Sequence, residues 1–463
     1  MSRPDKLLYI LSTVAVLVVV YLYNPLPLFF QNDDFIHIPQ SERGIWLQNG
    51  SFRPVSELFI RLDVMIWEKS AWGYHLTNLL LHMIAAGLVY FFAKELFTKI
   101  LCVKQYRQLS LITAILFFSY ALHSEAVFWI LGRSSMLATI FSLLFLFGYL
   151  KTTDSNFYFI LCIVSYVLAL LSYESSWLLL IFAGMITIRR STGLKSSGRE
   201  AVFLFVLLLS FLAYLSIRMY FTGSILGDYL ATGLSIDKAG FLVRNLFLLI
   251  VRSFIPPLFS GTFILSGFAL IFILFAFVFI AIPRRAKENL IFLSVLFLIS
   301  VLPFIGLGVD SYGTESERFL YLPTVFASCI LTYLISKANF KQALKLAAFV
   351  SLVLLHLLAL NNASNNYRKA GEVVQQTLSE IEKLDDGTQL HVKNLPQNQK
   401  GAYIFRSGFT EMCNWYGKKI SVDIISYKNE LSQLKLPLKV EKATSGSLSE
   451  KTFFYSDAEL LIY

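Results

Sequence analysis

A predominantly apolar run extends from Leu7 to Phe30, and the stretch Gln31-Asn32-Asp33-Asp34-Phe35 follows it directly. The run is about long enough to cross a hydrocarbon core of about 30 Å. Basic residues precede it and it lacks a small-residue cleavage site, so we expect a retained anchor whose N-terminal end lies in the cytoplasm. Two carboxylates at the mouth of a membrane span are costly to keep near lipid. Asp33 and Asp34 therefore predict a functional site at the outer end of this span.

The whole chain has the composition of a polytopic membrane protein. Its 463 residues are 56% hydrophobic, and the mean hydropathy is +0.63. The formal net charge is +10, but its excess lies in short loops, which marks the cytoplasmic side of a membrane and does not suggest nucleic-acid binding. These basic loop residues are Lys94, Lys99, Lys104, Arg107, Arg189, Arg190, Lys195, Arg199, Arg284, Arg285, Lys287, Lys337, Lys341 and Lys345.

With those loops inside, the apolar runs predict about eleven crossings. The short turn at His123-Ser124-Glu125 and the loop 31–74 then lie outside. Residues 240–260 carry Arg244 and Arg252 and end near a double proline, so we expect a re-entrant or interfacial helix there and not a crossing. The predicted spans lie near 7–30, 75–97, 109–122, 129–150, 157–171, 174–190, 200–221, 262–282, 289–308, 319–336 and 342–360.

The composition changes after Leu360. A helical period is visible over 367–384, and a second helix is expected near 407–416. Strand-like runs occur at 389–392, 402–405, 420–425 and 460–463. We therefore expect a membrane domain over 1–360 and a small α/β domain over 361–463, which the topology puts on the outer side.

Charged side chains from separate outer loops are expected to meet at one face. The planar fork of arginine binds phosphate through paired hydrogen bonds, and a carboxylate at the membrane surface can act as a general base toward a hydroxyl. Together they predict transfer from a membrane-embedded phosphate ester to a polar acceptor. Glu174 equally fits a role as a helix cap. The charged residues of this face include Asp33, Asp34, Arg53, Glu125, Arg133, Glu174 and Arg318.

Four motifs, in this order, resemble a known family. They are Phe52-Arg53-Pro54 with the stretch Trp72 to His82, then His123 to Arg133, then Leu171-Ser-Tyr-Glu174, and finally Glu317-Arg318-Phe-Leu-Tyr-Leu-Pro323. They resemble the membrane part of the transmembrane and tetratricopeptide-repeat O-mannosyltransferases and their bacterial homologues, which are large glycosyltransferases of the GT-C superfamily. The resemblance covers roughly residues 5–360.

The resemblance implies a GT-C fold and the transfer of a sugar, as in mannosyltransferases, from a polyprenyl-phosphate donor. We expect inversion, because a single displacement needs one base and no covalent carboxylate intermediate. It implies that Asp33 or Asp34 is the catalytic base and that Glu125, with His123 and Glu174, positions the acceptor or the donor. Arg318, with Arg133 and Arg53, would bind the donor phosphate. A divalent cation (Mg or Mn) held by Asp34 and Glu125 is left open, and no other cofactor is expected.

The sequence also departs from the family pattern. Tyr173 stands where relatives carry lysine, and Ser134-Ser135 stands where they often carry an acidic residue. The α/β segment takes the place of the repeats, so the acceptor is left open between a protein Ser/Thr hydroxyl and a glycolipid. We expect a multi-pass protein of a bacterial inner membrane with a cytoplasmic N-terminus and a periplasmic C-terminal domain. Its partners would be the lipid-linked donor, the acceptor and membrane lipid.

Two other classes of function remain as alternatives. A flippase or transporter of a lipid-linked or anionic substrate needs charged residues near the middle of its spans, whereas the charges here cluster at the outer ends. A membrane-anchored scaffold would act through the C-terminal domain alone. Mutating the outer carboxylates would then leave its function intact.

Overall fold

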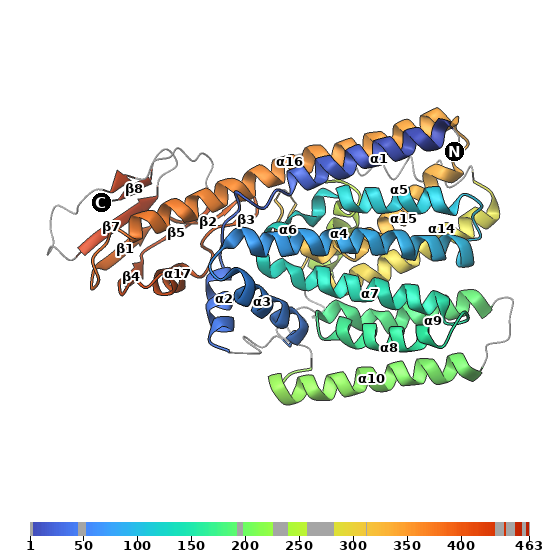
Figure 1. Ribbon diagram of the computed structural model, residues 1–463, viewed down its shortest axis with the longest axis horizontal. Coiled ribbons are helices and arrows are strands. Elements are labelled where there is room, and N and C mark those ends of the chain that lie inside the picture. The colour runs from blue at the N-terminus through green and yellow to red at the C-terminus, as the bar shows by residue number, and fades with distance from the viewer. Residues whose placement is uncertain are drawn as a thin grey trace.

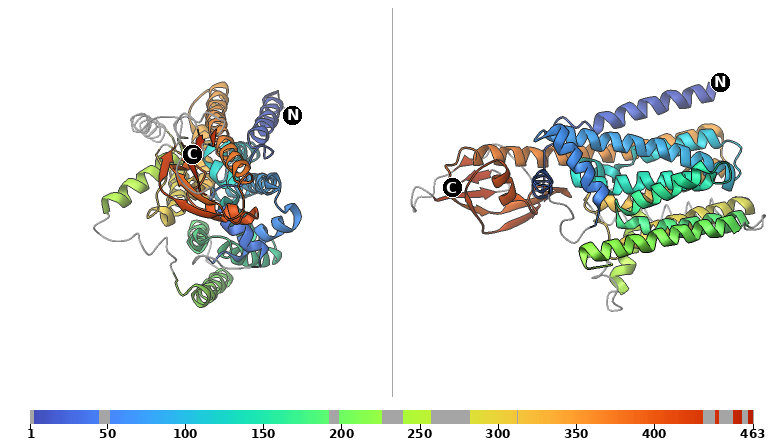
Figure 2. Two further views of the ribbon diagram at one scale, coloured as in Figure 1. Left: turned by 90° about the vertical axis from the view of Figure 1, so that its left-hand side faces the viewer. Right: turned by 60° about the horizontal axis from the view of Figure 1, so that its bottom comes forward.

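The computed structural model describes residues 3–44, 52–191, 198–225, 239–256, 282–311, 313–430, 439–440, 450–455 and 460–462. A bundle of roughly parallel helices holds the N-terminus at one end, and strands gather beyond the other end (Figure 1). The helix α16 (Gln342–Ile381) runs along the bundle and continues to the strands. The right-hand view in Figure 2 shows the same order along the long axis.

The helices of the bundle follow the predicted spans. Five described helices are long and apolar enough to cross a membrane, or six if a bent pair is one span. The predicted span 262–282 falls almost wholly outside the described residues, so the count of about eleven stays a prediction. The bundle contains α1 (Arg3–Leu22), α4 (Ala71–Glu95), α5 (Tyr106–Ser119), α7 (Arg133–Lys151), α8 (Phe157–Leu170), α9 (Leu179–Ser191), α10 (Gly198–Thr222), α14 (Arg284–Val301) and α15 (Pro323–Lys337), together with α16.

The basic loops lie at one end of the bundle. This agrees with the prediction that they share one side of the membrane. Lys99 donates hydrogen bonds to the Leu150 carbonyl oxygen at 3.1 Å and to Asp154 at 2.9 Å. Arg190 donates to the same Leu150 oxygen at 2.8 Å. The chain after α4, the end of α7 and the end of α9 therefore lie together. Which side of the membrane this end faces remains a prediction.

At the opposite end, which we call the outer end because the predicted topology places it outside, the chain forms short helices. The loop 31–74 contains α2 (Asp34–Glu42) and α3 (Pro54–Trp67). Between α5 and α7 lie η2 (Ala121–His123), α6 (Ser124–Phe128) and η3 (Ile130–Gly132), and α5 meets the segment 121–128 at 55°. A Cβ at position 132 would lie 2.6 Å from the Glu125 carbonyl oxygen, so glycine allows η3 to fold back against α6.

The turn His123-Ser124-Glu125 lies at this end, and all three residues are fully buried. The reason is that later parts of the chain cover them: η7 (Glu317–Leu320) and the segment around residue 403 pack over α6. The turn is an interior element at the outer end of the bundle.

The helix α12 (Ala239–Arg252) belongs to this outer end. Its 14 residues span about 21 Å, less than the thickness of a hydrocarbon core. Asn245 donates to the Ile305 carbonyl oxygen at 2.9 Å, and Arg252 donates to that of Gly313 at 3.2 Å. The helix thus lies beside the chain that follows α14. Whether residues 240–260 form an interfacial or re-entrant helix stays a prediction, and residues 257–260 lie outside the described residues.

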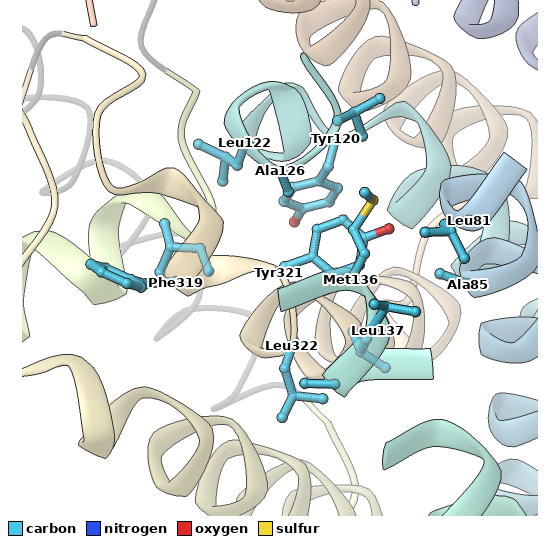
Figure 3. Close-up of a cluster of buried hydrophobic side chains, with 14 of the residues drawn as sticks. Leu81, Ala85, Tyr120, Leu122, Ala126, Met136, Leu137, Phe319, Tyr321 and Leu322 are labelled. Carbon is cyan, nitrogen blue, oxygen red and sulfur yellow. The ribbon is translucent and has the colours of Figure 1, made fainter. Parts of the chain in front are cut away.

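A large cluster of buried hydrophobic side chains lies beside the short helices of the outer end (Figure 3). Residues of α4 and α7 meet residues of the broken segment 120–126 and of the chain after Phe319. Because these side chains exclude water, neighbouring charged groups such as the buried Glu125 are held in a medium of low polarity. The labelled members are Leu81, Ala85, Tyr120, Leu122, Ala126, Met136, Leu137, Phe319, Tyr321 and Leu322.

The C-terminal strands form two sheets among the described residues. The larger has the order β4-β1-β7-β8-β6, with β1 parallel to both neighbours, and the smaller has the order β3-β2-β5. The strands predicted near 389, 402, 420 and 460 are present, whereas β2, β5, β6 and β7 were not predicted. The elements are β1 (Gln389–Lys393), β2 (Leu395–Gln399), β3 (Ala402–Tyr403), α17 (Phe409–Trp415), β4 (Ser421–Ile424), β5 (Tyr427–Glu430), β6 (Lys439–Val440), β7 (Glu450–Tyr455) and β8 (Leu460–Ile462).

The C-terminal part is packed directly on the outer end of the bundle. The Asn32 N–H donates to the Ile404 carbonyl oxygen at 2.9 Å, and the Thr314 N–H donates to that of Lys400 at 3.3 Å. Gly401 has φ +88°, and a Cβ there would lie 2.3 Å from the Thr314 nitrogen. The predicted domain boundary at residue 360 falls inside the continuous helix α16, and the division into two domains stays a prediction.

Alanine substitutions at Gly401 and Gly417 distinguish two effects, namely backbone strain and a clash of the new Cβ with a neighbouring segment. Both have φ above +80°, but a Cβ at Gly417 has no atom within 4 Å. We expect Gly417→Ala to reduce the free energy of unfolding by about 1 kcal/mol through strain alone. Gly401→Ala should cost about 1–3 kcal/mol more because the chain must move away from Thr314. Thermal unfolding in detergent measures both, and equal losses would contradict the tight docking of this segment.

Candidate active site at the outer end of the bundle

The two adjacent carboxylates of the first predicted site have different surroundings. Asp34 is fully buried, and its Oδ2 accepts a hydrogen bond from the Gln31 N–H at 2.9 Å. Burial raises the pKa of Asp34 well above its ordinary value, although that hydrogen bond opposes the rise. Asp33 is partly exposed and accepts a hydrogen bond from the hydroxyl of Ser407. Only Asp33 of the pair is therefore open to solvent.

Glu125 holds Arg318 at the centre of the outer end. One carboxylate oxygen accepts from the Arg318 guanidinium, and the other accepts from the Arg318 backbone N–H at 2.8 Å. The hydroxyl of Tyr403 donates to Glu125 Oε1 at 3.0 Å and accepts from Arg318 at 3.4 Å. Burial and the negative charge of Glu125 raise the pKa of Tyr403, so the phenol stays protonated and remains a donor. This triad joins the bundle to the C-terminal part.

The Arg318 side chain lies between aromatic rings. Its guanidinium carbon is 5.0 Å from the centre of the Trp129 ring and 4.6 Å from that of Phe319. The side chain is 16% exposed, whereas its partner Glu125 is 0% exposed. The rings and the buried carboxylate fix the orientation of the guanidinium, and its open edge can reach an anion.

A second buried ion pair lies directly beside the first. Glu317 pairs with Arg252 of α12 and accepts from the Ser124 hydroxyl at 3.0 Å. Burial raises the pKa of Glu317, although Arg252 and Ser124 act in the opposite direction. The neighbours Glu317 and Arg318 thus anchor η7 to α12 and α6 respectively. Ser316, just before them, has φ +69°, which brings both side chains into place.

Arg133 has a different environment from Arg318. It is fully buried and forms an ion pair with Asp63 at 2.6 Å. Its remaining donors reach the carbonyl oxygens of Ile130 at 3.1 Å, Phe59 at 3.3 Å and Tyr74 at 3.3 Å. These contacts fasten α3 and α4 to the start of α7. They leave Arg133 little capacity to bind a further anion.

Arg53 and Glu174 meet in a third cluster. Arg53 contacts Glu174 at 2.9 Å, and Arg218 of α10 contacts the other carboxylate oxygen at 3.1 Å. Burial favours the neutral acid, but the two arginines prevail and lower the pKa of Glu174. The Arg53 guanidinium also lies 4.3 Å from the centre of the Tyr173 ring. Glu174 therefore joins the start of α3 to α10.

His123 points into the bundle and away from the charged groups. Its Nε2 is 2.8 Å from the Thr324 hydroxyl, and the centre of its ring lies 4.4 Å from the ring centres of both Phe117 and Tyr321. The structure thus brings Glu125 and Arg318 together and gathers Arg53 with Glu174. It keeps His123 and Arg133 in structural contacts of their own.

Several residues of the site were not predicted from the sequence. Tyr403 and Ser407 come from the C-terminal part, and Arg218 and Arg252 come from α10 and α12. Arg252 carried a weak signal, because a charged residue in an apolar stretch of a membrane protein needs a partner. Tyr403 and Ser407 carried none, because only tertiary packing brings a strand near residue 403 over α6.

The residues suggested as metal ligands do not fit that role as they are arranged. Asp34 is buried against the Gln31 N–H, and both oxygens of Glu125 accept hydrogen bonds from Arg318 or Tyr403. Within the described ranges there is no group of three or more His, Cys, Asp or Glu side chains arranged to hold a metal ion. No step of the chemistry below is therefore assigned to a metal.

The fold is similar to that of ArnT. The structure of ArnT from Cupriavidus metallidurans bound to undecaprenyl phosphate superposes with a TM-score of 0.52, at 10% sequence identity, over 91% of this chain and 90% of that one. The apo structure of the same protein gives a TM-score of 0.51 over the same shares. At this identity the likeness establishes the fold, and the chain is an integral multi-pass membrane protein.

The sequence is similar to protein O-mannosyl-transferases, and the predicted resemblance is confirmed. The mouse protein O-mannosyl-transferase TMTC3 is 31% identical over 129 residues, which are 28% of this chain and 13% of the mouse protein. Human TMTC2 is 36% identical over 108 residues, or 23% of this chain and 12% of that protein. The matches thus cover a small part of these relatives. No protein-family model matches the chain.

The buried pair of Arg133 and Asp63 should be structural. We expect Arg133→Met to lower the free energy of unfolding by about 3–5 kcal/mol, because it leaves Asp63 buried without its partner. The double variant Asp63→Leu with Arg133→Met should recover much of that loss. Arg284→Ala, which removes an exposed ion pair with Glu288, is the control and should change little. Thermal unfolding in detergent would contradict this role if Arg133→Met were as stable as the control.

Proposed function

We propose that the protein is a membrane glycosyltransferase that moves a sugar from a polyprenyl-phosphate donor to an acceptor hydroxyl at the extracytoplasmic face. The observation that carries the proposal is the presence, at the same end of the bundle, of an accessible carboxylate, Asp33, and a partly exposed arginine, Arg318. The undecaprenyl phosphate named for ArnT supports the lipid donor. The O-mannosyl-transferase names of the relatives support a hydroxyl acceptor.

Asp33 is the proposed catalytic base. A base must reach the proton that it removes, and Asp33 already accepts a hydrogen bond from a hydroxyl group. The buried carboxylate of Asp34 instead stabilises the start of α2 through the Gln31 N–H. This difference favours Asp33 over Asp34 as the base.

Arg318 and Arg53 are the proposed contacts of the donor phosphate. Negative charge develops on the leaving phosphate, and fixed guanidinium groups in a water-poor site stabilise it. Arg318 is oriented by Glu125 and Trp129, and Arg53 is held by Glu174 with its side chain 18% exposed. Glu125 and Glu174 are then positioning residues. Arg133 and His123, which the sequence suggested, have no part in this scheme.

A single displacement with inversion is the expected course. The acceptor oxygen attacks the anomeric carbon while Asp33 takes its proton, and the bond from that carbon to the phosphate oxygen breaks. A retaining route needs a carboxylate that is free to act as a nucleophile. Glu125 and Glu174 are both held by arginines, which supports the single step.

The site lies at the end of the bundle opposite the basic loops. Since excess Lys and Arg favours the cytoplasmic side, we infer that the site faces outward, into the periplasm of a bacterial cell. The C-terminal part would then be extracytoplasmic as well. The acceptor is a protein Ser/Thr hydroxyl or a glycolipid.

The base assignment is tested by transfer assays in membranes. With a panel of radiolabelled polyprenyl-phosphate sugars, we expect Asp33→Asn to reduce kcat by about 10²–10⁴-fold, as for loss of a general base. The exposed Asp423→Asn in β4 is the matched control and should keep full activity. Transfer that is unaffected by Asp33→Asn would refute the assignment. Lipid that changes leaflet without any transfer of label would favour a transporter.

Arg318 is tested through the affinity for the donor. Arg318→Lys keeps the charge that Glu125 needs but loses the planar fork, so the donor KM should rise about tenfold, with a smaller change in stability. Arg284→Lys makes the same exchange at an exposed ion pair with Glu288, far from the site, and should leave the donor KM unchanged. Equal donor KM values for both variants would remove Arg318 from the phosphate site.

A further inference from the structure

The hydroxyl of Ser407 lies where an acceptor hydroxyl is needed. It donates a hydrogen bond to Asp33 Oδ1 and lies 3.1 Å from Asn32 Oδ1. The Ser407 backbone N–H donates to the same Asn32 oxygen at 2.9 Å. A general base and the proton that it removes must be in this relation. Ser407 therefore has the geometry of a substrate, although it belongs to the protein itself.

The chain around Ser407 is held as a bound peptide would be. Ala402 and Tyr403 form β3, which pairs with β2 at the edge of the smaller sheet. The next residue, Ile404, accepts a hydrogen bond from the Asn32 N–H at 2.9 Å. An extended segment is thus bonded through its main chain to the loop that carries Asp33. Main-chain pairing of this kind is how proteins bind extended peptides independently of their side chains.

Asp33 and the Ser407 side chain that contacts it are accessible to solvent. Asp33 and Ser407 are both partly exposed, and Arg406 between the strand and Ser407 is exposed. Gly408 follows with φ +83°, and a Cβ there would lie 2.4 Å from the Asn32 carbonyl oxygen. The turn at Gly408 therefore brings the serine against Asp33 and leads the chain away again.

We propose that residues 405–408 occupy the acceptor position as an internal mimic, and that the acceptor is a serine or threonine of an extended polypeptide. This inference rests on the proposed function, with Asp33 as the base. The incoming hydroxyl replaces that of Ser407. Its proton passes to Asp33, its oxygen bonds to the anomeric carbon, and the bond from that carbon to the phosphate oxygen breaks. The polyprenyl phosphate leaves with the electron pair.

The test uses the full-length protein in membranes with a labelled polyprenyl-phosphate sugar. The acceptor probe is a synthetic peptide with the sequence Ala402–Phe409. The wild type should label this peptide but not the same peptide carrying the Ser407→Ala change. The Ser407→Ala protein should use the peptide with a KM about tenfold lower, because the acceptor no longer competes with a hydrogen bond to a carboxylate. Ser407→Thr should behave as the wild type.

Ser379→Ala on the exposed side of α16 is the matched control and should leave the peptide KM unchanged. A Ser407→Ala protein with lower kcat and unchanged peptide KM, restored by Ser407→Thr, would overturn the proposal, since Ser407 would then only position Asp33. A wild type that labels glycolipid but not the peptide would overturn it as well. Failure of the proposed function has a different signature: Asp33→Asn would then be as active as the wild type toward every acceptor.

Discussion

The outer end of the molecule depends on the buried pairing of Glu125 with Arg318. Glu125 is placed by the fold-back of η3 on α6, which Gly132 permits. Arg318 is placed by η7, and Tyr403 reaches the same carboxylate from the C-terminal part. Three segments far apart in the sequence are thus joined at one carboxylate. Because a buried charge without a partner is very costly, each segment requires the others.

The cost of burying an unpaired charge also bears on the other charged residues of the outer end, which differ in their exposure. Arg133, Arg218 and Arg252 are almost completely buried and are paired with Asp63, Glu174 and Glu317 respectively. These pairs fasten α3, α10 and α12 to the bundle. Asp33 and Arg318 remain partly exposed at the same end. We infer that the buried ion pairs stabilise the fold and that the partly exposed Asp33 and Arg318 are available to contact a substrate.

The sequence predicted the helices of the bundle well, because each apolar run has a fixed minimum length in a membrane. It also predicted that charged groups of the motifs, among them Glu125 and Arg318, come together at one end. It could not show that Asp34 and Arg133 are buried whereas Asp33 and Arg318 are partly exposed, because burial depends on tertiary packing and on partners such as Gln31 and Asp63. Tyr403 and Ser407 lie in an ordinary strand and turn. Only the docking of that segment onto the bundle brings them to the site.

The central claim is that the outer end binds the phosphate of a lipid-linked sugar between the bundle and the C-terminal part. A structure of the protein with a bound polyprenyl phosphate tests this directly. We expect the phosphate within hydrogen-bond distance of Arg318 and on the same side of the bundle as Asp33. A phosphate bound instead at the opposite end, beside Lys99 and Arg190, would contradict the account.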